Sequence, residues 1–377
     1  MIKRIKRFWL RVTNGMSLGE LWKQFRTDAS LSYRLYSQEV DTRRKPGTGK
    51  IRHLFRLVNH FFWAVVDKLT PARRVLLVFA LILLATNFEI SFEGSGHHSS
   101  STLFIGPLPA SVWGELLLLM VLILEVTDRV VMKRDLQIAK EIQSWLLPAS
   151  PPAFHGMEIA FATRAANTIA GDYYDVFPRP GSGTPAATYL LAIADVAGKS
   201  VPAALLMATF QASLKTLAAT SSSPAELVGQ MNNYACFNSQ NGRRFTTTFI
   251  AEYDPASRQL TYVNAGHNEP ILRRRTGAIE RLTVGGMPLG ITQGAQYESG
   301  TATLESGDWL VIFTDGVPDA ENVAAQEYGE SRLMVVLNVN AGMAPAALLN
   351  EIMMDLDRFV GYAPQHDDIT LLLLKMA

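Results

Sequence analysis

The sequence of 377 residues has a single cysteine, and charged residues make up only 18% of it. Cys236 therefore has no intramolecular disulfide partner, and no Cys/His spacing typical of a zinc site occurs. We interpret Cys236 as a small buried apolar residue and not as a nucleophile. Two glycine–lysine segments, 47–50 and 198–200, lack the first glycine of a phosphate-binding loop, because Arg44 and Ile193 stand in its place. Neither segment supports a nucleoside triphosphatase.

The charged residues are unevenly distributed. Residues 1–74 contain 17 Lys and Arg against 5 Asp and Glu, a net +12, which leaves −11 on the remainder. Such a basic segment suggests nucleic acid or an anionic membrane surface as its partner. No DNA-binding motif is recognisable, so we favour the membrane surface and expect no nucleic-acid partner. No cleavage site follows a short apolar run, so we expect no removable signal peptide. Helical spacing of apolar residues over 51–70 predicts an amphipathic helix.

Two apolar stretches, 75–90 and about 104–124, approach the ~20 residues that a membrane-spanning helix needs. Two buried core helices are the alternative. Lys and Arg flank both stretches on the sides that would face the cytoplasm, which favours insertion. Glu89 and Glu115 would then lie at the outer interface, because charges are costly at mid-bilayer. The sequence predicts a transmembrane helical hairpin in the inner (cytoplasmic) membrane, multi-pass, with an external loop at 92–103 and both ends in the cytoplasm.

Residues 125–150 are predicted to form a linker helix that leaves the membrane. Val131, Ile138, Ile142 and Trp145 share one stripe of this helix, which could pair with a second copy. We therefore expect a homodimer through the linker helix. From residue 151 to residue 377 short β-rich runs alternate with turns and helices, and the length suits one core. The predicted organisation is a basic cytoplasmic segment (1–74), two transmembrane helices (75–124), the linker helix and one α/β (α+β) domain (151–377).

Acidic residues of this domain stand next to apolar runs. Asp195 ends the run 189–194, Asp315 ends the run 309–314, and Asp367 and Asp368 immediately precede the run 369–374. Asp172 and Asp175 follow an aromatic and small-residue run. Each of these motifs alone is compatible with an ordinary turn. Together they suggest clustered carboxylates, which are unfavourable unless cations neutralise them. Oxygen-only clusters suit Mg²⁺ or Mn²⁺, and two such ions can activate a water.

These residues resemble those of the metal-dependent protein phosphatase family (PPM, type 2C-like), in its bacterial SpoIIE/RsbU branch. The matching strings run in family order and cover about 60% of the chain, but not residues 1–130. They are AKEIQ (139–143), LLP (146–148), AGDYYDV (170–176), ADVAGKSVPAAL (194–205), Met207, TTF (247–249), NAGH (264–267), PLG (288–290), TDGV (314–317), Glu321 and DDIT (367–370).

The resemblance implies an αββα sandwich, in which two antiparallel sheets lie face to face with helices outside and metals bind in the cleft where strands end. It implies that Asp195 bridges two Mn²⁺ or Mg²⁺ ions, that the carbonyl of Val196 binds one of them, and that Asp315 and Asp367 are ligands on the second side. It also implies that Asp172 acts directly or through water, so that Asp195 and Asp172 are the expected catalytic residues. Asp368 stays open as the alternative to Asp367. The implied reaction is hydrolysis of phosphoserine or phosphothreonine by metal-bound hydroxide, without a phosphoenzyme.

Some features depart from the family pattern of type 2C enzymes. Ala197 stands where the eukaryotic enzymes carry a histidine, so no general acid is assigned. His267 is a candidate for that role, with a structural turn histidine as the alternative. Arg164 could bind the substrate phosphate, although its spacing differs from the eukaryotic pattern. Ser200 replaces a frequent glycine, and the helix predicted over 202–217 resembles a regulatory switch.

The leading hypothesis is a membrane-anchored protein-serine/threonine phosphatase acting on a phosphoprotein, by resemblance an anti-sigma-factor antagonist in a partner-switching pathway. A catalytically weak membrane scaffold that binds a phosphoprotein is the alternative from another class. Hydrolysis of a small phosphorylated metabolite is a third possibility.

Overall fold

The computed structural model describes residues 63, 66–67, 69–85, 110–152, 156–179, 188–239 and 244–377. These residues form two compact units, which divide in the sequence between Val131 and Met132. The predicted external loop at 92–103 and the basic residues 1–50 lie outside the described residues, as does most of the amphipathic helix predicted over 51–70.

The first unit contains helix α4 (Pro71–Ala85) and the beginning of helix α5 (Ala110–Leu146). The two helices run antiparallel. Arg73 near the start of α4 forms ion pairs with Glu125 (3.2 Å) and Asp128 (2.6 Å) of α5. Farther along α4, a Cβ at Gly114 of α5 would lie 2.9 Å from the carbonyl oxygen of Ala80. Residues later in α4 therefore contact residues earlier in α5, as in a helical hairpin.

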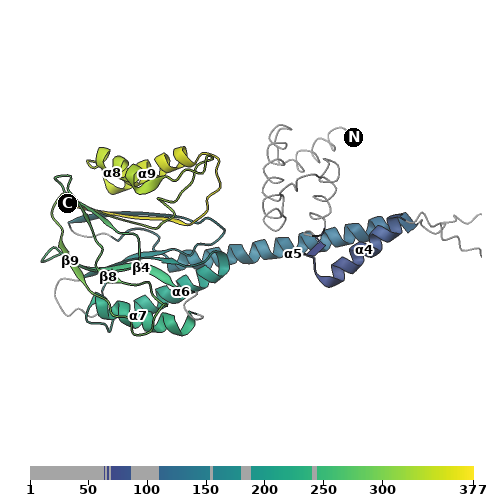
Figure 1. Ribbon diagram of the computed structural model, residues 1–377, viewed down its shortest axis with the longest axis horizontal. Coiled ribbons are helices and arrows are strands. Elements are labelled where there is room, and N and C mark those ends of the chain that lie inside the picture. The colour runs from purple at the N-terminus through teal and green to yellow at the C-terminus, as the bar shows by residue number, and fades with distance from the viewer. Residues whose placement is uncertain are drawn as a thin grey trace, which may run out of the picture. The chain divides into compact units, whose positions relative to one another are not determined.

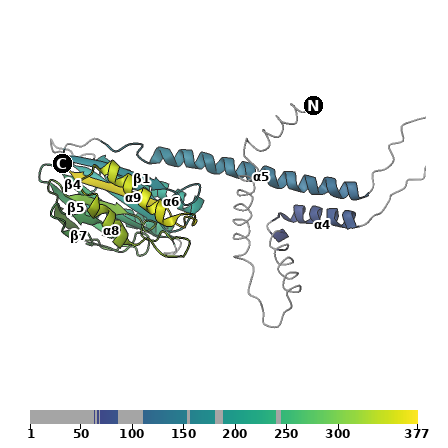
Figure 2. The ribbon, with the colours of Figure 1, turned by 90° about the horizontal axis from the view of Figure 1, so that it is seen from above.

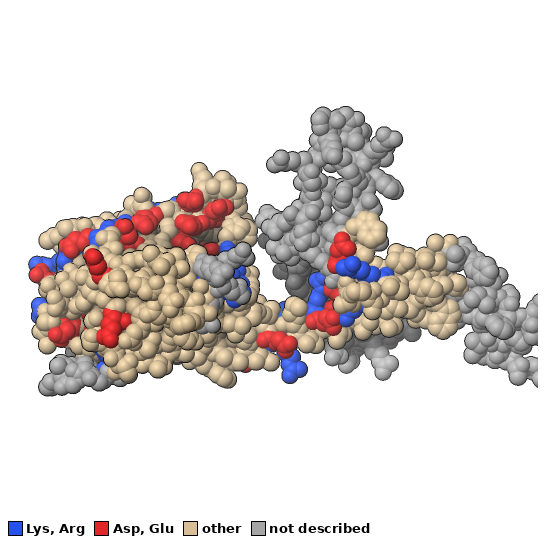
Figure 3. Space-filling view, turned by 60° about the horizontal axis from the view of Figure 1, so that its bottom comes forward, with Lys and Arg blue, Asp and Glu red and all other residues tan. Residues whose placement is uncertain are grey.

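Large apolar side chains of both helices are exposed to solvent. They are Val75, Val78, Phe79, Leu81 and Ile82 of α4, and Leu116, Leu119, Met120, Leu122, Ile123 and Val126 of α5. On the visible face of these helices Figure 3 shows a largely uncharged surface, with charged side chains gathered toward one end. Among the described residues, α5 alone is both long and apolar enough to cross a membrane.

The second unit contains two sheets. The first has the order β1 (Met157–Arg164), β11 (Ile369–Met376), β10 (Trp309–Phe313), β6 (Ile271–Arg273) and β7 (Ile279–Arg281). The second has the order β2 (Tyr173–Pro178), β3 (Tyr189–Val196), β4 (Thr246–Asp254), β5 (Gln259–Ala265) and β8 (Gly285–Gly286), and β9 (Gly300–Thr303) also pairs with β5. The resemblance implied two antiparallel sheets, and every pair that these strands form is antiparallel except β5 with β8, which is parallel.

Helices cover the outer face of each sheet (Figure 1). Helices α8 (Gly329–Val339) and α9 (Pro345–Val360) lie over the first sheet, where Figure 2 shows them in front of the strands, and helices α6 (Ser200–Leu217) and α7 (Pro224–Asn238) lie over the second. Three apolar cores separate these four layers. The central core joins the sheets through side chains such as Ile193, Phe249, Ile312 and Leu372, and the other two lie between each sheet and its helices. Since buried apolar area is the main stabilising contribution, the three cores hold the four layers together.

The end of α5 belongs to this second unit. The side chain of Gln143 donates to the carbonyl of Ala170 (2.6 Å) and accepts from the backbone N–H of the same residue (3.0 Å). Ala170 lies immediately before the Gly171–Asp172 motif. The last turns of the linker helix are therefore bonded to the segment that carries one of the predicted site residues.

Candidate active site

Strand ends bring the predicted carboxylates to one end of the sandwich. Asp172 immediately precedes β2 and Asp195 is next to the last residue of β3, and the two strands are antiparallel neighbours in which Tyr173 pairs with Ala194. Asp315 follows β10 and Asp367 precedes β11, which are antiparallel neighbours in the other sheet. Each sheet therefore contributes a carboxylate pair.

Hydrogen bonds join the two pairs across the sheets. Thr314 Oγ1 donates to Asp172 Oδ2 (2.9 Å), and the N–H of Gly171 donates to Asp368 Oδ2 (2.6 Å). Gly316 lets two backbones approach closely, because a Cβ at this position would lie 1.9 Å from the carbonyl oxygen of Asp368. Segments distant in the sequence thus meet at one site.

The carboxylates of this cluster affect one another's ionisation. Burial raises the pKa of Asp195 to about 7, with further contributions from Asp315, Asp367 and Asp368. Burial and then the negative charge of Asp195 hold the pKa of Asp172 well above its ordinary value. The pKa of Asp315 is also raised, first by burial and then by the negative charge of Asp367. Independent turns would not interact in this way, so the geometry favours a shared site for cations.

The two adjacent aspartates before β11 have different surroundings. Asp368 accepts from the N–H of Ala166 (2.7 Å) and of Gly171 (2.6 Å), so both of its oxygens bind backbone. Asp367 is 40% exposed, and its Oδ2 lies 3.1 Å from Lys199 Nζ. Of the two alternatives left open by the sequence, this arrangement favours Asp367 as the side chain that faces a cation and Asp368 as a structural tie.

The donor set suits hard divalent ions in its chemistry. It consists of carboxylate oxygens and of the carbonyl of Val196, which lies 3.2 Å from the position that a Cβ on Gly171 would take. No group of three or more His, Cys, Asp or Glu side chains within the described ranges already stands at metal-binding spacing. The residues fit Mg²⁺ or Mn²⁺ in kind, because all of their donor atoms are oxygens.

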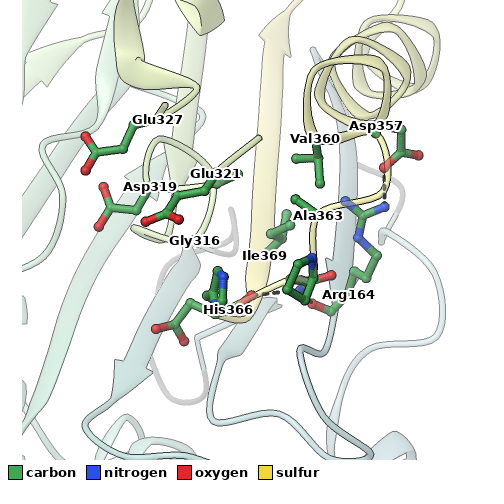
Figure 4. Close-up of a pocket in the computed structure, with 15 residues that line it drawn as sticks. Arg164, Gly316, Asp319, Glu321, Glu327, Asp357, Val360, Ala363, His366 and Ile369 are labelled. Carbon is green, nitrogen blue, oxygen red and sulfur yellow. Dashed lines mark hydrogen bonds and ion pairs between the residues drawn. The ribbon is translucent and has the colours of Figure 1, made fainter. Parts of the chain in front are cut away.

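A cavity of about 430 Å³ opens beside Asp367. Arg164 lines it at the end of β1, where Nη1 donates to Asp357 Oδ1 (2.5 Å). Figure 4 shows Arg164 beside Asp357 on one side of this cavity, and three further acidic side chains, Asp319, Glu321 and Glu327, on the other. Of the four predicted site aspartates, Asp367 lines this cavity together with Arg164, and the other three do not.

His267 lies behind the cluster and not in the cavity lining. Its side chain is buried, with Nδ1 3.3 Å from Thr247 Oγ1, and Thr247 pairs with Asp195 across β3 and β4. Its backbone N–H donates to Asn264 Oδ1 (2.7 Å). Burial lowers the pKa of His267 to about 4, so the ring is neutral at pH 7 and has no proton to give as an imidazolium acid. The structure therefore favours His267 as a structural turn histidine and not as a general acid.

This burial predicts an acid-side loss of stability. Because the pKa of His267 is near 6.5 in the unfolded chain and about 4 in the folded one, only the unfolded chain takes up the proton between these values. Lowering the pH from 7 to 5 should therefore reduce the free energy of unfolding by about 2 kcal/mol through this ring. Urea unfolding of His267→Gln at both pH values should show a loss smaller by that amount than in the wild type. An equal loss in both proteins would mean that the ring titrates normally in the fold.

Several contributing residues were not identified as such from the sequence. Thr314 was noted only as part of a motif, Lys199 only as part of a failed phosphate-loop match and of a family string, and Gln143 only as part of another family string. A threonine directly before Asp315 and a lysine four residues after Asp195 were the available signals. Cys236 is half-buried, less than predicted, and burial raises its thiol pKa, which agrees with a residue that is not a nucleophile.

A family model and two phosphoserine phosphatases are similar to this chain in sequence. The family model of Stage II sporulation protein E (SpoIIE) matches residues 185–377, which include Asp195, Asp315 and Asp367. "Phosphoserine phosphatase RsbU" of Bacillus subtilis is 29% identical over 247 residues, 64% of this chain and 70% of RsbU. "Phosphoserine phosphatase RsbP" of the same organism is 24% identical over 190 residues, 50% of this chain and 46% of RsbP.

Solved structures agree on the fold. The SiaA-PP2C domain of Pseudomonas aeruginosa superposes with a TM-score of 0.57 at 21% identity, covering 66% of this chain and 99% of that domain. The PP2C phosphatase domain of SpoIIE from Bacillus subtilis, with a fragment of its regulatory domain, superposes with a TM-score of 0.50 at 16% identity, covering 58% of this chain and 61% of that one.

Two facing sheets between helix pairs, with aspartates of both sheets gathered at the strand ends, define a PP2C-like α/β phosphatase domain. The matched family model covers just over half of the chain. The chain belongs to the SpoIIE family and is a serine/threonine protein phosphatase of the SpoIIE/RsbU branch.

Proposed function

We propose that this chain is a membrane-anchored phosphatase that hydrolyses phosphoserine or phosphothreonine of a protein with the help of two divalent ions. The observation that carries the proposal is the convergence of carboxylates from both sheets, where burial and then the negative charge of neighbouring aspartates raise the pKa of Asp195, Asp172 and Asp315. When bound, Mn²⁺ or Mg²⁺ would neutralise these charges and supply an activated water.

Each carboxylate has a distinct proposed task. Asp195, at the end of β3, would hold both ions, and the Val196 carbonyl would hold one of them. Asp315 and Asp367, from the other sheet, would hold the second side. Asp172, which is 1% exposed and bonded by Thr314 Oγ1, acts on the ions directly or through water. Because the carboxylates are held at strand ends, little reorganisation of the backbone is needed to bind the ions.

The cavity beside Asp367 is the proposed entrance for the phosphorylated residue. Arg164 at its edge provides a guanidinium group suited to phosphate. The names of RsbU and RsbP support a phosphoserine protein as substrate, and an anti-sigma-factor antagonist of a partner-switching pathway is the proposed partner. The aspartates present at positions 172, 195, 315 and 367 speak against a scaffold without turnover.

Metal removal tests the proposed reaction. Purified full-length protein stripped with EDTA should lose hydrolysis of p-nitrophenyl phosphate and of a phosphoserine protein, and added Mn²⁺ should restore both. A scaffold would bind the phosphoprotein but release no phosphate with or without Mn²⁺. Turnover of p-nitrophenyl phosphate with no turnover of any phosphoprotein tested would favour a small phosphorylated metabolite.

The exposed apolar helices support the anchoring part of the proposal. A pair of antiparallel helices with a large uncharged surface is unfavourable in water and suits the hydrocarbon region of a bilayer, with the phosphatase domain in the cytoplasm. Exposed Ile138, Ile142 and Trp145 on the linker helix likewise support a homodimer. We expect the full chain to sediment with membranes after a carbonate wash and to have the mass of two chains in detergent. Recovery in the soluble fraction would contradict the anchor, and the mass of one chain would contradict the dimer.

A further inference from the structure

A lysine stands among the aspartates. Lys199 Nζ lies 3.1 Å from Asp367 Oδ2 and also donates to the backbone carbonyl of His366. Its positive charge also acts to lower the pKa of Asp195, Asp315 and Asp368, and so opposes the increase caused by burial and by the neighbouring carboxylates. An isolated exposed ion pair contributes little to stability. One ammonium group close to several carboxylates, however, reduces the repulsion between them.

The same contact occupies the carboxylate of Asp367. Its Oδ1 accepts from the N–H of Asp368 (3.0 Å), and its Oδ2 faces Lys199. Both oxygens therefore have partners inside the protein. A divalent ion that binds Asp367 would therefore have to replace at least one of these two partners.

The backbone holds Lys199 in this position. It has an extended conformation (φ −134°, ψ 159°) and immediately precedes α6. It lies between Gly198 (φ 115°) and Ser200 (φ 63°), both in the left-handed region. The lysine therefore links the first residue of α6 with the loop before β11, two segments that are 167 residues apart in the sequence.

We propose that Lys199 is an internal counter-ion, which occupies the place of a divalent ion at Asp367 and must leave when that ion binds. The proposal rests on the two-ion site proposed above. Since Lys199 directly precedes α6, binding of the second ion releases the contact that ties this helix to the β11 loop. Lys199 thereby sets the metal concentration at which the site is complete and acts as a positioning residue.

Calorimetric titration of Mn²⁺ into EDTA-stripped, detergent-solubilised full chain tests this role. Lys199→Met should bind the weaker of the two Mn²⁺ ions roughly tenfold more tightly, because a competing charge-assisted contact of about 1.4 kcal/mol is removed. The stripped variant should also melt about 2 °C below stripped wild type, because the aspartates lose a neutralising charge. Lys199→Arg keeps the positive charge and should retain wild-type affinity. Lys375→Met, which removes a lysine bonded to the carbonyls of Gly342 and Met343, is the matched control and should not change Mn²⁺ affinity.

Unchanged or weaker Mn²⁺ binding by Lys199→Met would overturn the proposal. Equal tightening in Lys199→Met and Lys199→Arg would also overturn it, since that result would make the lysine's shape and not its charge responsible. If wild type and all variants bind no Mn²⁺, both the two-ion function and the role of Lys199 are wrong. If the wild type binds Mn²⁺ and Lys199→Met binds it with the same affinity, only the role of Lys199 is wrong.

Discussion

Asp195→Asn is expected to lower Mn²⁺-dependent hydrolysis of a phosphoserine protein by roughly 10³-fold, since losing about 4 kcal/mol of transition-state stabilisation has that effect. Asp195 ends a buried strand and is surrounded by Asp315, Asp367 and Asp368. Asparagine has nearly the same shape but no negative charge, so it cannot bridge two divalent ions. The measurement is kcat at saturating Mn²⁺ on the purified full chain.

The matched control is Asp254→Asn. Asp254 lies at the far end of β4 from Thr247, the residue paired with Asp195, and its carboxylate accepts from the N–H of Ala256 and the hydroxyl of Ser257. This substitution should leave kcat within about twofold, because surface changes away from the site have small effects. The stripped Asp195→Asn protein should melt no lower than stripped wild type, since the substitution removes repulsion. Activity retained in Asp195→Asn would contradict the proposed site.

Gly316→Ala is expected to have the second large effect. The added Cβ would overlap the carbonyl oxygen of Asp368, 1.9 Å away, and a backbone atom cannot move aside as a flexible side chain can. The clash should separate β10 from the loop before β11 and so move Asp315 away from Asp367. We expect the loss of about 3 kcal/mol of unfolding free energy, or a Tm lower by roughly 6–12 °C, together with weaker Mn²⁺ binding.

Gly342→Ala is the control for this change, because an added Cβ at Gly342 meets no atom within 4 Å. Thermal unfolding of both variants and Mn²⁺ titration of both distinguish a local clash from a general effect of losing a glycine. Equal Tm values for Gly316→Ala and wild type would show that the two backbones are not in close contact.

The sequence could predict the site's carboxylates because each adjoins a strand that is apolar along most of its length. The runs before Asp195 and Asp315 and after Asp368 are β3, β10 and β11 in the structure. A continuous apolar run predicts a strand covered on both faces, and the three cores of the sandwich provide that cover. The sandwich came from the family resemblance and not from periodicity, and the pairing order of the strands was not predicted.

Contacts between distant segments could not be predicted in the same way. The bond from Gly171 to Asp368 and the ion pair of Lys199 with Asp367 join positions far apart in the sequence, and no local pattern encodes them. The difference between Asp367 and Asp368 depends on which oxygens bind backbone N–H groups. Ser200 was correctly placed at a position that favours glycine, since its φ is 63°. Helix α6 begins at Ser200, two residues before its predicted start.

The central physical claim is that aspartates from both sheets share two divalent ions. Anomalous diffraction at the manganese edge from crystals of the protein grown with Mn²⁺ would locate them. We predict two peaks, with Asp195 binding both ions, Asp315 and Asp367 on the second side, and Lys199 turned away from Asp367. No peak among these residues, or a Mn²⁺ ion bound elsewhere with the Lys199–Asp367 contact intact, would contradict the claim.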